Sequence, residues 1–246
     1  MPGTIPGTIP GTIPSSPLSY SPLLPPLSLL SFGFIRKVYG LLSLQFALTV
    51  AVASACMLHA PLRNWILANS ATAYYGSVLP AFLCLLVLMR CKDTYPTNVQ
   101  CLTFFTAAQA FSIGVVCALY YAAGYGAVIL EAAALTTVVF GALSLFACQT
   151  KIDFTVYSGL LYSLLVSLVV WGIFCSLFGF STNGLYSWLG TLVFCGYVVI
   201  DTQMIMNKFG VDDYIIAAIE LYLDILNLFL YILSILSESN SYSYND

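Results

Sequence analysis

Residues 219–230 read IELYLDILNLFL, a run suited to burial in hydrocarbon except for two carboxylates and one amide. A charged side chain at the centre of a bilayer costs on the order of 3 kcal/mol or more, so acids in such places are usually paired or functional. Glu220 and Asp224 are four residues apart, and Asn227 follows three residues later. A helix therefore places all three on one face. We expect this polar stripe to face the interior of a helix bundle, as a structural hydrogen-bond seam or in contact with water or an ion.

The composition of the whole chain excludes a water-soluble globule. Of its 246 residues, 60% are hydrophobic and only 7% are charged, whereas soluble domains carry about 25% charged residues. Too few polar side chains are present to cover a water-facing surface, so we predict a membrane protein with several spans. The formal net charge is −3 and the seven basic residues form no patch, so no nucleic-acid partner is expected.

Seven apolar runs follow the basic pair Arg36 and Lys37. A bilayer core about 30 Å thick needs roughly 20 helical residues to cross it, and turn or charge signals separate the runs. They lie near residues 38–58, 72–89, 99–122, 126–148, 155–178, 185–206 and 213–236. The sequence therefore predicts an all-α integral membrane protein with seven transmembrane helices. Six spans followed by a re-entrant segment is the alternative, because the seventh run carries the carboxylates.

The basic residues indicate an orientation in the membrane. If every run crosses, six basic residues fall on one side and only Arg63 falls on the other. Short cytosolic loops are enriched in Lys and Arg, so we predict a cytosolic N-terminus. The last tail has no Lys or Arg and does not decide whether the seventh run crosses. The six residues are Arg36, Lys37, Arg90, Lys92, Lys151 and Lys208.

The two ends of the chain differ from the apolar middle. Residues 2–13 repeat PGTI three times, and further prolines continue to Pro26. Such a segment cannot bury a core and should stay extended or disordered. We predict a disordered Pro- and Gly-rich cytosolic tail over residues 1–35, a transmembrane bundle over residues 36–236, and a short polar tail over residues 237–246.

No metal or cofactor site is predicted. The eight cysteines are scattered, and no two have the C-x-x-C spacing of metal and redox motifs. Most lie inside apolar runs, where Cys behaves as a small hydrophobic residue. The single histidine, His59, follows the first run and is interpreted as a loop residue.

Asp201 can meet the polar stripe of the last run. It lies late in the sixth run, and Asp224 lies on the returning helix. Counted from the bend near Gly210, both reach comparable depth at a rise of about 1.5 Å per residue. Two carboxyls in contact in a low dielectric cannot both ionise cheaply, so we expect the pair to share a proton. Such a pair would sense pH without histidine. The acids inside predicted spans are Glu131, Asp201, Glu220 and Asp224.

Five stretches of the chain resemble the transmembrane Bax-inhibitor-motif proteins, in particular their lifeguard branch. The resemblance covers residues 35–236 and leaves out the Pro-rich tail. Its most specific motif is the last one. The stretches are residues 36–39 (RKVY), the region of Arg90, residues 149–154 (QTKIDF), residues 201–203 (DTQ) and residues 221–229 (LYLDILNLF).

The resemblance implies a seven-helix bundle with the last helix central, calcium leak from stores or across a membrane, and suppression of cell death. It also implies that Asp201 and Asp224 form a pH-sensing pair, with Arg90 at the cytosolic end of the second helix as a latch. Glu131 matches a pattern seen in relatives. Glu220 departs from the pattern, which has a neutral polar residue there, and the tail after the last helix lacks the expected basic residues.

We therefore predict a pH-sensitive, calcium-permeable leak channel and no enzyme. An ionised Asp201 pairs with Arg90 and holds the cytosolic end closed, so acid should favour opening. Calcium is the permeating ion and not a cofactor. The expected partners are the lipid bilayer, calcium ions and apoptosis-regulating membrane proteins. The expected location is the Golgi, the endoplasmic reticulum or another organelle membrane, with the plasma membrane as the alternative. The candidate ion pathway comprises Glu131, Glu220 and Asn227.

Other classes of function stay open. A membrane protein that inhibits apoptosis by binding partners has the Pro-rich tail as its independent support. An intramembrane aspartyl protease also uses two aspartates on neighbouring helices, but the contexts V-I-D and L-Y-L-D lack the glycines of its G-x-G-D motif. A proton-coupled transporter is disfavoured because no internal inverted repeat is visible. A seven-helix receptor would place its N-terminus outside, against the distribution of basic residues.

Overall fold

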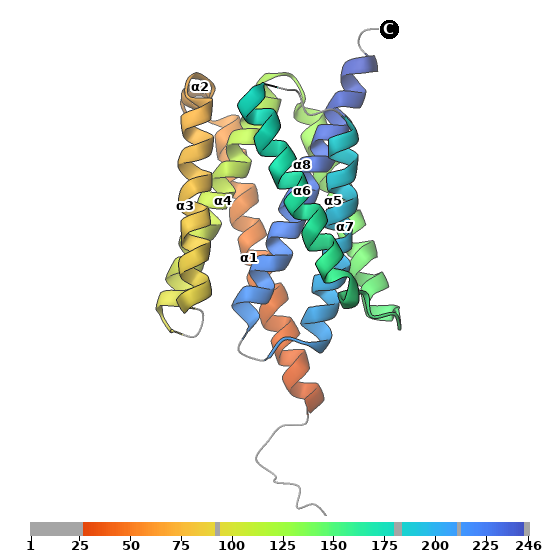
Figure 1. Ribbon diagram of the computed structural model, residues 1–246. Coiled ribbons are helices and arrows are strands. Elements are labelled where there is room, and N and C mark those ends of the chain that lie inside the picture. Colours follow the sequence, from red (N-terminus) through yellow and green to blue (C-terminus); the bar gives the residue numbers. More distant parts are fainter. Residues whose placement is uncertain (1–26, 92–93, 180–183, 211–212, 244–246) are drawn as a thin grey trace, which may run out of the picture.

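The protein is a bundle of seven long helices in a computed structural model that describes residues 27–91, 94–179, 184–210 and 213–243 (Figure 1). A short helix joins the first two long ones, a 3₁₀-helix precedes the fifth, and these four stretches contain no strand. The long helices are α1 (Leu27–Leu58), α3 (Ser70–Cys91), α4 (Thr97–Ala122), α5 (Gly126–Gln149), α6 (Ser158–Phe178), α7 (Gly184–Asn207) and α8 (Tyr214–Ser243). The short elements are α2 (Ala60–Ala68) and η1 (Phe154–Tyr157).

All seven long helices have the length and hydropathy of membrane spans. This confirms the prediction of an all-α membrane protein with seven transmembrane helices. The apolar segment of α8, Tyr214–Asn240, is continuous over 27 residues. At about 1.5 Å per residue it extends roughly 40 Å, more than the bilayer core of about 30 Å. Its length is therefore that of a full crossing and not of a short re-entrant segment.

The predicted organisation differs from the observed one mainly at the two ends of the bundle and at α2. α1 begins at Leu27 and α8 continues to Ser243, so parts of both predicted tails are helical. Residues 1–26 and 244–246, the rest of those tails, lie outside the described residues. Helix α2 was not predicted, because Pro61 suggests a turn. Pro61 in fact lies in the first turn of α2, where its missing N–H removes no helical hydrogen bond.

Helix α8 is the centre of the bundle, as the family resemblance implied. It packs against α7, α1, α5 and α4. Its buried side chains include Leu221, Leu228 and Leu233, all with no exposed surface. Helix α6 is peripheral, because its substantial contacts are limited to α7 and η1. Its many apolar side chains therefore face outward, as expected for a helix against lipid.

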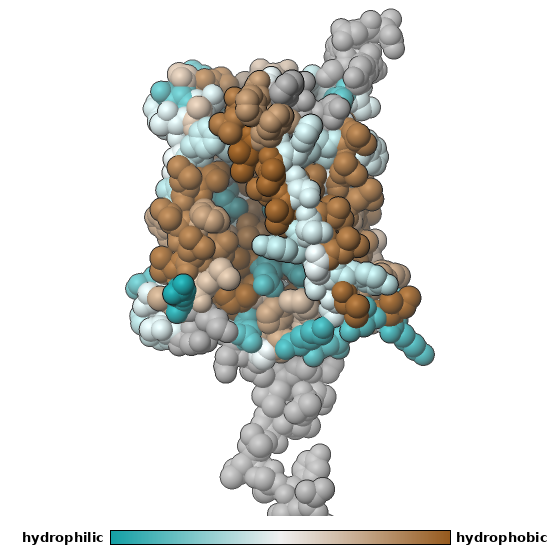
Figure 2. All heavy atoms as spheres, in the orientation of Figure 1, coloured by the Kyte–Doolittle hydropathy of each residue, from teal (hydrophilic) through white to brown (hydrophobic). Residues whose placement is uncertain are grey.

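The distribution of apolar and basic side chains agrees with a membrane-spanning bundle. Figure 2 shows apolar side chains across the middle of one face and hydrophilic side chains toward its two ends. One end, here named the basic end, holds the beginning of α1 and the last turns of α3, α5 and α7 (Figure 1). Arg63, in α2, lies at the opposite end, and Lys92 lies outside the described residues. The basic end carries Arg36, Lys37, Arg90, Lys151 and Lys208.

Candidate functional site

Two buried aspartates meet between α7 and α8. The side chains of Asp201 and Asp224 are 8% and 5% exposed, and their carboxyl groups lie close enough to interact with each other. Asp201 lies six residues before the end of α7 and Asp224 ten residues after the start of α8, which places both roughly 10–15 Å from the basic end. A hydrogen bond between two carboxyl groups requires a proton on one of them. Asp201 and Asp224 thus face each other from α7 and α8, and the sharing of a proton between them stays a prediction.

The surroundings of the pair supply few hydrogen-bond donors. Oδ2 of Asp224 and Oε2 of Glu220 are buried, and neither accepts a hydrogen bond from an N–H or O–H group of the described residues. Glu220 is also close enough to Asp201 and Asp213 to interact with both electrostatically. The carboxyl stripe of α8 thus faces α7, and its unpaired oxygens are available to a proton, to water or to a cation.

Asn227 is half-buried and does not join the carboxyl pair. Its Nδ2 donates a hydrogen bond of 2.8 Å to the carbonyl oxygen of Leu223 in its own helix. Asn227 therefore extends the predicted polar stripe of α8, but its side chain is hydrogen-bonded to the backbone of its own helix. The assignment of Asn227 to an ion pathway stays a prediction.

Two residues of the predicted site lie away from the carboxyl pair. Arg90 is exposed in the last turn of α3, which packs mainly against α4. Figure 1 shows α3 on the opposite flank of the bundle from α6 and α7. Glu131 is exposed on the second turn of α5, near the end of the bundle opposite the basic end. The structure thus brings neither residue to Asp201, and their predicted roles as latch and ion pathway remain predictions.

A second polar cluster, not predicted from the sequence, lies between α1, α4 and α8. The hydroxyl of Tyr222 lies 2.8 Å from Oγ1 of Thr49. Thr49 donates its own proton to the carbonyl oxygen of Gln45 at 2.8 Å, so Tyr222 is the donor. Nε2 of Gln45 donates to Oγ1 of Thr106 at 3.1 Å. Tyr222 is two residues before Asp224 and therefore points to the other side of α8.

The DTQ and QTKIDF motifs touch each other at the basic end. Gln203 is buried, and its Oε1 accepts a hydrogen bond of 2.8 Å from the backbone N–H of Phe154. Its Nε2 donates to the carbonyl oxygen of Ile152, also at 2.8 Å. Gln203 therefore fixes the segment between α5 and η1 to α7, two residues from Asp201. The sequence carried both motifs but no signal that they meet.

Side chains of the segment between α5 and η1, and of η1 itself, also form hydrogen bonds with each other. Asp153 is the N-cap of η1 and accepts hydrogen bonds from the backbone N–H (3.0 Å) and the hydroxyl of Thr155. The hydrogen bond from the Thr155 hydroxyl has the larger effect and the one from its N–H the smaller, and both hold the pKa of the exposed Asp153 carboxyl below its usual value. Lys208 donates a hydrogen bond to the same Thr155 hydroxyl. The loop is thus bound to the end of α7 by Gln203 and by Lys208.

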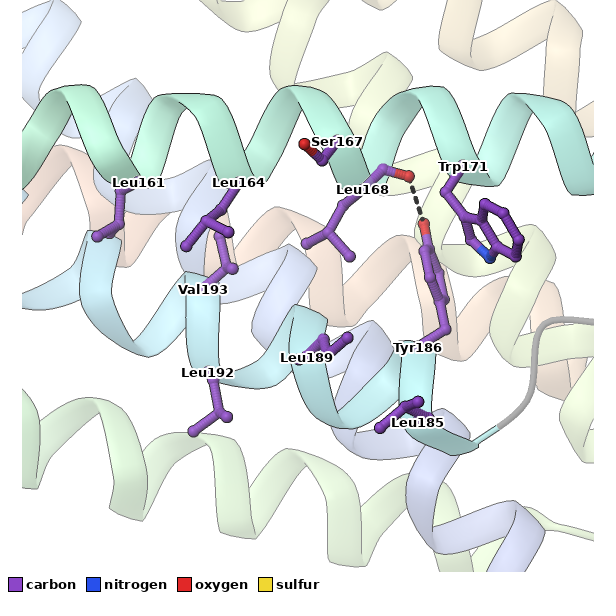
Figure 3. A pocket seen from close by; sticks show the side chains of 10 residues that line it. All are labelled: Leu161, Leu164, Ser167, Leu168, Trp171, Leu185, Tyr186, Leu189, Leu192 and Val193. Carbon is purple, nitrogen blue, oxygen red and sulfur yellow. Dashed lines mark hydrogen bonds between the residues drawn. The ribbon is translucent and has the colours of Figure 1, made fainter.

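A groove between α6 and α7 has a volume of about 590 Å³, but its lining residues include no carboxylic acid or basic side chain that could bind a cation or transfer a proton. Figure 3 shows the side chains of Leu161 and Leu168 from α6 turned toward those of Leu189 and Val193 from α7. The hydroxyl of Tyr186 donates a hydrogen bond of 3.2 Å to the carbonyl oxygen of Leu168. None of the lining residues is an acid or a base. We therefore assign the candidate site to the carboxyl pair and not to this groove.

Comparison with known proteins agrees with the resemblance found in the motifs. A family model described as "Inhibitor of apoptosis-promoting Bax1" matches residues 32–241. The chain is 35% identical over 217 residues to the BI1-like protein of Arabidopsis thaliana, covering 86% of this chain and 83% of that protein. It is 36% identical over 213 residues to Protein LIFEGUARD 4 of the same plant, covering 84% and 85%.

A viral protein is similar to the same degree. The Golgi anti-apoptotic protein of Vaccinia virus (strain Lister) is 34% identical over 208 residues, which cover 84% of this chain and 86% of the viral protein. The residues that the family model matches include the whole of α3 to α7, most of α1 and α8, and both Asp201 and Asp224. This chain therefore belongs to the Bax inhibitor, or lifeguard, family of membrane proteins.

Proposed function

We propose that this protein is a pH-sensitive, calcium-permeable leak channel that lowers stored calcium and suppresses cell death. The observation that carries the proposal is the contact between the buried carboxyl groups of Asp201 and Asp224. A pair of this kind changes its charge when it gains or loses a proton, and it does so inside the membrane-spanning part of the bundle. The anti-apoptotic names of the relatives support the effect on cell death.

The unpaired carboxylate oxygens support a cation as the permeating species. Calcium takes oxygen ligands, carboxylates among them. Oδ2 of Asp224 and Oε2 of Glu220 are such oxygens and have no donor among the described side chains and backbone groups. A cation with part of its hydration shell can lie beside them, whereas an anion would be repelled.

We propose an intracellular membrane, with the Golgi membrane first, as the site of action. A relative of similar length is named Golgi anti-apoptotic protein. The basic end would face the cytosol, because Lys and Arg are enriched in short cytosolic loops. The carboxyl pair would then titrate mainly from the cytosolic side, to which it is nearer.

Calcium flux into liposomes across a pH series tests this proposal. Purified wild-type protein should give a flux that rises as the pH falls, because protonation discharges the pair. Asp201→Asn and Asp224→Asn should each weaken or shift the pH dependence, since each replaces one titrating carboxyl of the pair by an amide that does not titrate. Glu238→Gln, the same kind of change near the other end of α8, is the matched control and should keep the wild-type response. A pH response left intact in both Asp variants would assign the sensor to other residues.

A further inference from the structure

A polar cleft at the basic end carries groups that the proposed channel does not use. It has a volume of about 310 Å³ and lies between the end of α5, η1 and the end of α7. In contrast to the groove of Figure 3, much of its lining is polar. The polar lining includes Lys151, Asp153, Gln203, Asn207 and Lys208. The cleft therefore combines the QTKIDF motif with the end of the helix that holds Asp201.

The cleft has a net positive charge. Lys151 and Lys208 are two of the chain's seven basic residues, and both are exposed. Lys208 donates one hydrogen bond to Thr155, and an ammonium group has two further N–H donors to offer. Asp153 supplies the one negative charge in the lining, and it already accepts hydrogen bonds from the N–H and hydroxyl of Thr155. One positive charge is therefore left uncompensated.

The position of the two lysines in the membrane points to a ligand. Lys151 lies two residues after the end of α5, and Lys208 directly follows the end of α7. Both helices are membrane spans, so the cleft lies where the hydrocarbon gives way to lipid headgroups. The anion concentrated at that level is the phosphate of a phospholipid, and basic side chains there are attracted to anionic lipids.

We propose that this cleft binds the phosphate group of an anionic phospholipid headgroup, with Lys151 and Lys208 as its charged ligands. Gln203 contributes by holding the lining segment against α7 through its bonds to Ile152 and Phe154. The two lysines, one from each segment, are thereby kept at one cleft before the lipid binds, which lowers the cost of ordering them. The site is separate from the carboxyl pair, and its test does not depend on ion flux.

Direct binding measurements on the purified, full-length protein in detergent distinguish the sources of the phosphate. The probes are dioctanoyl phosphatidic acid, dioctanoyl phosphatidylcholine and inorganic phosphate, each titrated by calorimetry. We expect saturable binding of the phosphatidic acid, with an affinity at least about tenfold above those of the two other probes. Equal binding of inorganic phosphate would overturn the lipid assignment. Equal binding of the zwitterionic phosphatidylcholine would overturn the requirement for an anionic headgroup.

Substitutions of residues that line the cleft test whether the phospholipid binds there. The double change Lys151→Gln and Lys208→Gln should weaken phosphatidic acid binding by about tenfold. Arg36→Gln, which removes an exposed basic residue at the same end but outside the cleft, should leave it unchanged. Asp153→Asn should strengthen binding, because it removes the opposing charge and keeps an oxygen acceptor for Thr155. Wild-type affinity in the double variant would place the site elsewhere. If that variant does not fold, weaker binding by Asp153→Asn would overturn the proposal.

Discussion

The carboxyl groups of Asp201 and Asp224 depend on each other because the surrounding side chains supply few donors. We expect a shared proton to take the place of a basic partner, since one carboxyl can donate to the other only when protonated. This differs from the more usual arrangement in which a buried acid is neutralised by Arg or Lys. A third carboxyl, that of Glu220, lies near Asp201 and on the same face of α8 as Asp224.

A first prediction concerns the hydroxyl of Tyr222. Tyr222→Phe removes the donor to Thr49 and keeps the ring that packs against Phe46 at a centroid distance of 5.4 Å. Hydrogen bonds between membrane helices contribute about 0.6 kcal/mol on average, so we expect a loss of that size in the free energy of unfolding. Thermal or denaturant unfolding in detergent measures it. The control Tyr75→Phe changes a tyrosine that is 53% exposed and should have no effect. A loss of equal size in both variants would show that the buried bond is not its cause.

At the scale of helices, α7 and α8 are held together along their whole length. The hydroxyls of Ser187 and Ser234 are 2.8 Å apart toward one end of the pair, and the carboxyl pair lies toward the other. Between them the ring of Tyr231 lies directly against Gly190. Small side chains at such places let helices approach closely, which is how packing stabilises helix pairs in membranes.

A second prediction tests this close approach. Gly190→Ala should destabilise the protein by about 1–3 kcal/mol, because a Cβ there would lie under 3.0 Å from ring atoms of Tyr231, so that the ring or a helix must shift. Gly141→Ala is the matched control, since the position is also inside a helix but has nothing within 4 Å. It should be neutral or slightly stabilising. Equal melting temperatures for the two variants would contradict the packing described for α7 and α8.

A third prediction concerns α3 and the proposed latch. Arg90 can reach Asp201 only if the end of α3 moves toward α7, because α3 packs mainly against α4. If an ionised Asp201 holds the channel closed through Arg90, Arg90→Gln should raise calcium flux at neutral pH to near its acidic level. The liposome assay measures this, with Arg36→Gln as the control. An unaltered pH response in Arg90→Gln would exclude the latch and leave the carboxyl pair to act alone.

At the scale of the whole molecule, the bundle is asymmetric in charge. The basic end carries Arg36, Lys37, Arg90, Lys151 and Lys208, while Arg63 lies at the other end. The carboxyl pair is nearer the basic end, as is the proposed headgroup site. A membrane protein with this distribution has one preferred orientation. Both sites would then respond to the composition of the cytosol and of the cytosolic leaflet.

A fourth prediction concerns the topology. If all seven helices cross, the two ends of the chain lie on opposite sides of the membrane, and the basic residues predict that the N-terminus is cytosolic. A glycosylation sequon appended after Asp246 should therefore be modified in the secretory pathway, and one placed before Met1 should not. A re-entrant α8 would leave both unmodified. Modification at the N-terminus alone would reverse the orientation and with it the cytosolic assignment of the carboxyl pair.

The sequence by itself determined the seven long helices and the comparable depth of Asp201 and Asp224. Hydropathy and run length are local properties, so the seven spans could be identified one at a time. Asp201 and Asp224 lie on consecutive helices joined by a short bend, and the depth of each follows from counting residues from that bend. Nothing beyond the helical rise was needed to bring them to the same level.

Only the tertiary structure decided which faces and which distant segments touch. The contacts of Gln45 with Thr106, of Thr49 with Tyr222 and of Gln203 with Ile152 join segments far apart in the chain. They depend on the rotation and the neighbours of each helix. In a mostly apolar span these are set by the fit of many side chains, which no short pattern encodes. For the same reason the sequence did not reveal that Arg90 is separated from Asp201, which follows from the packing of α3 against α4.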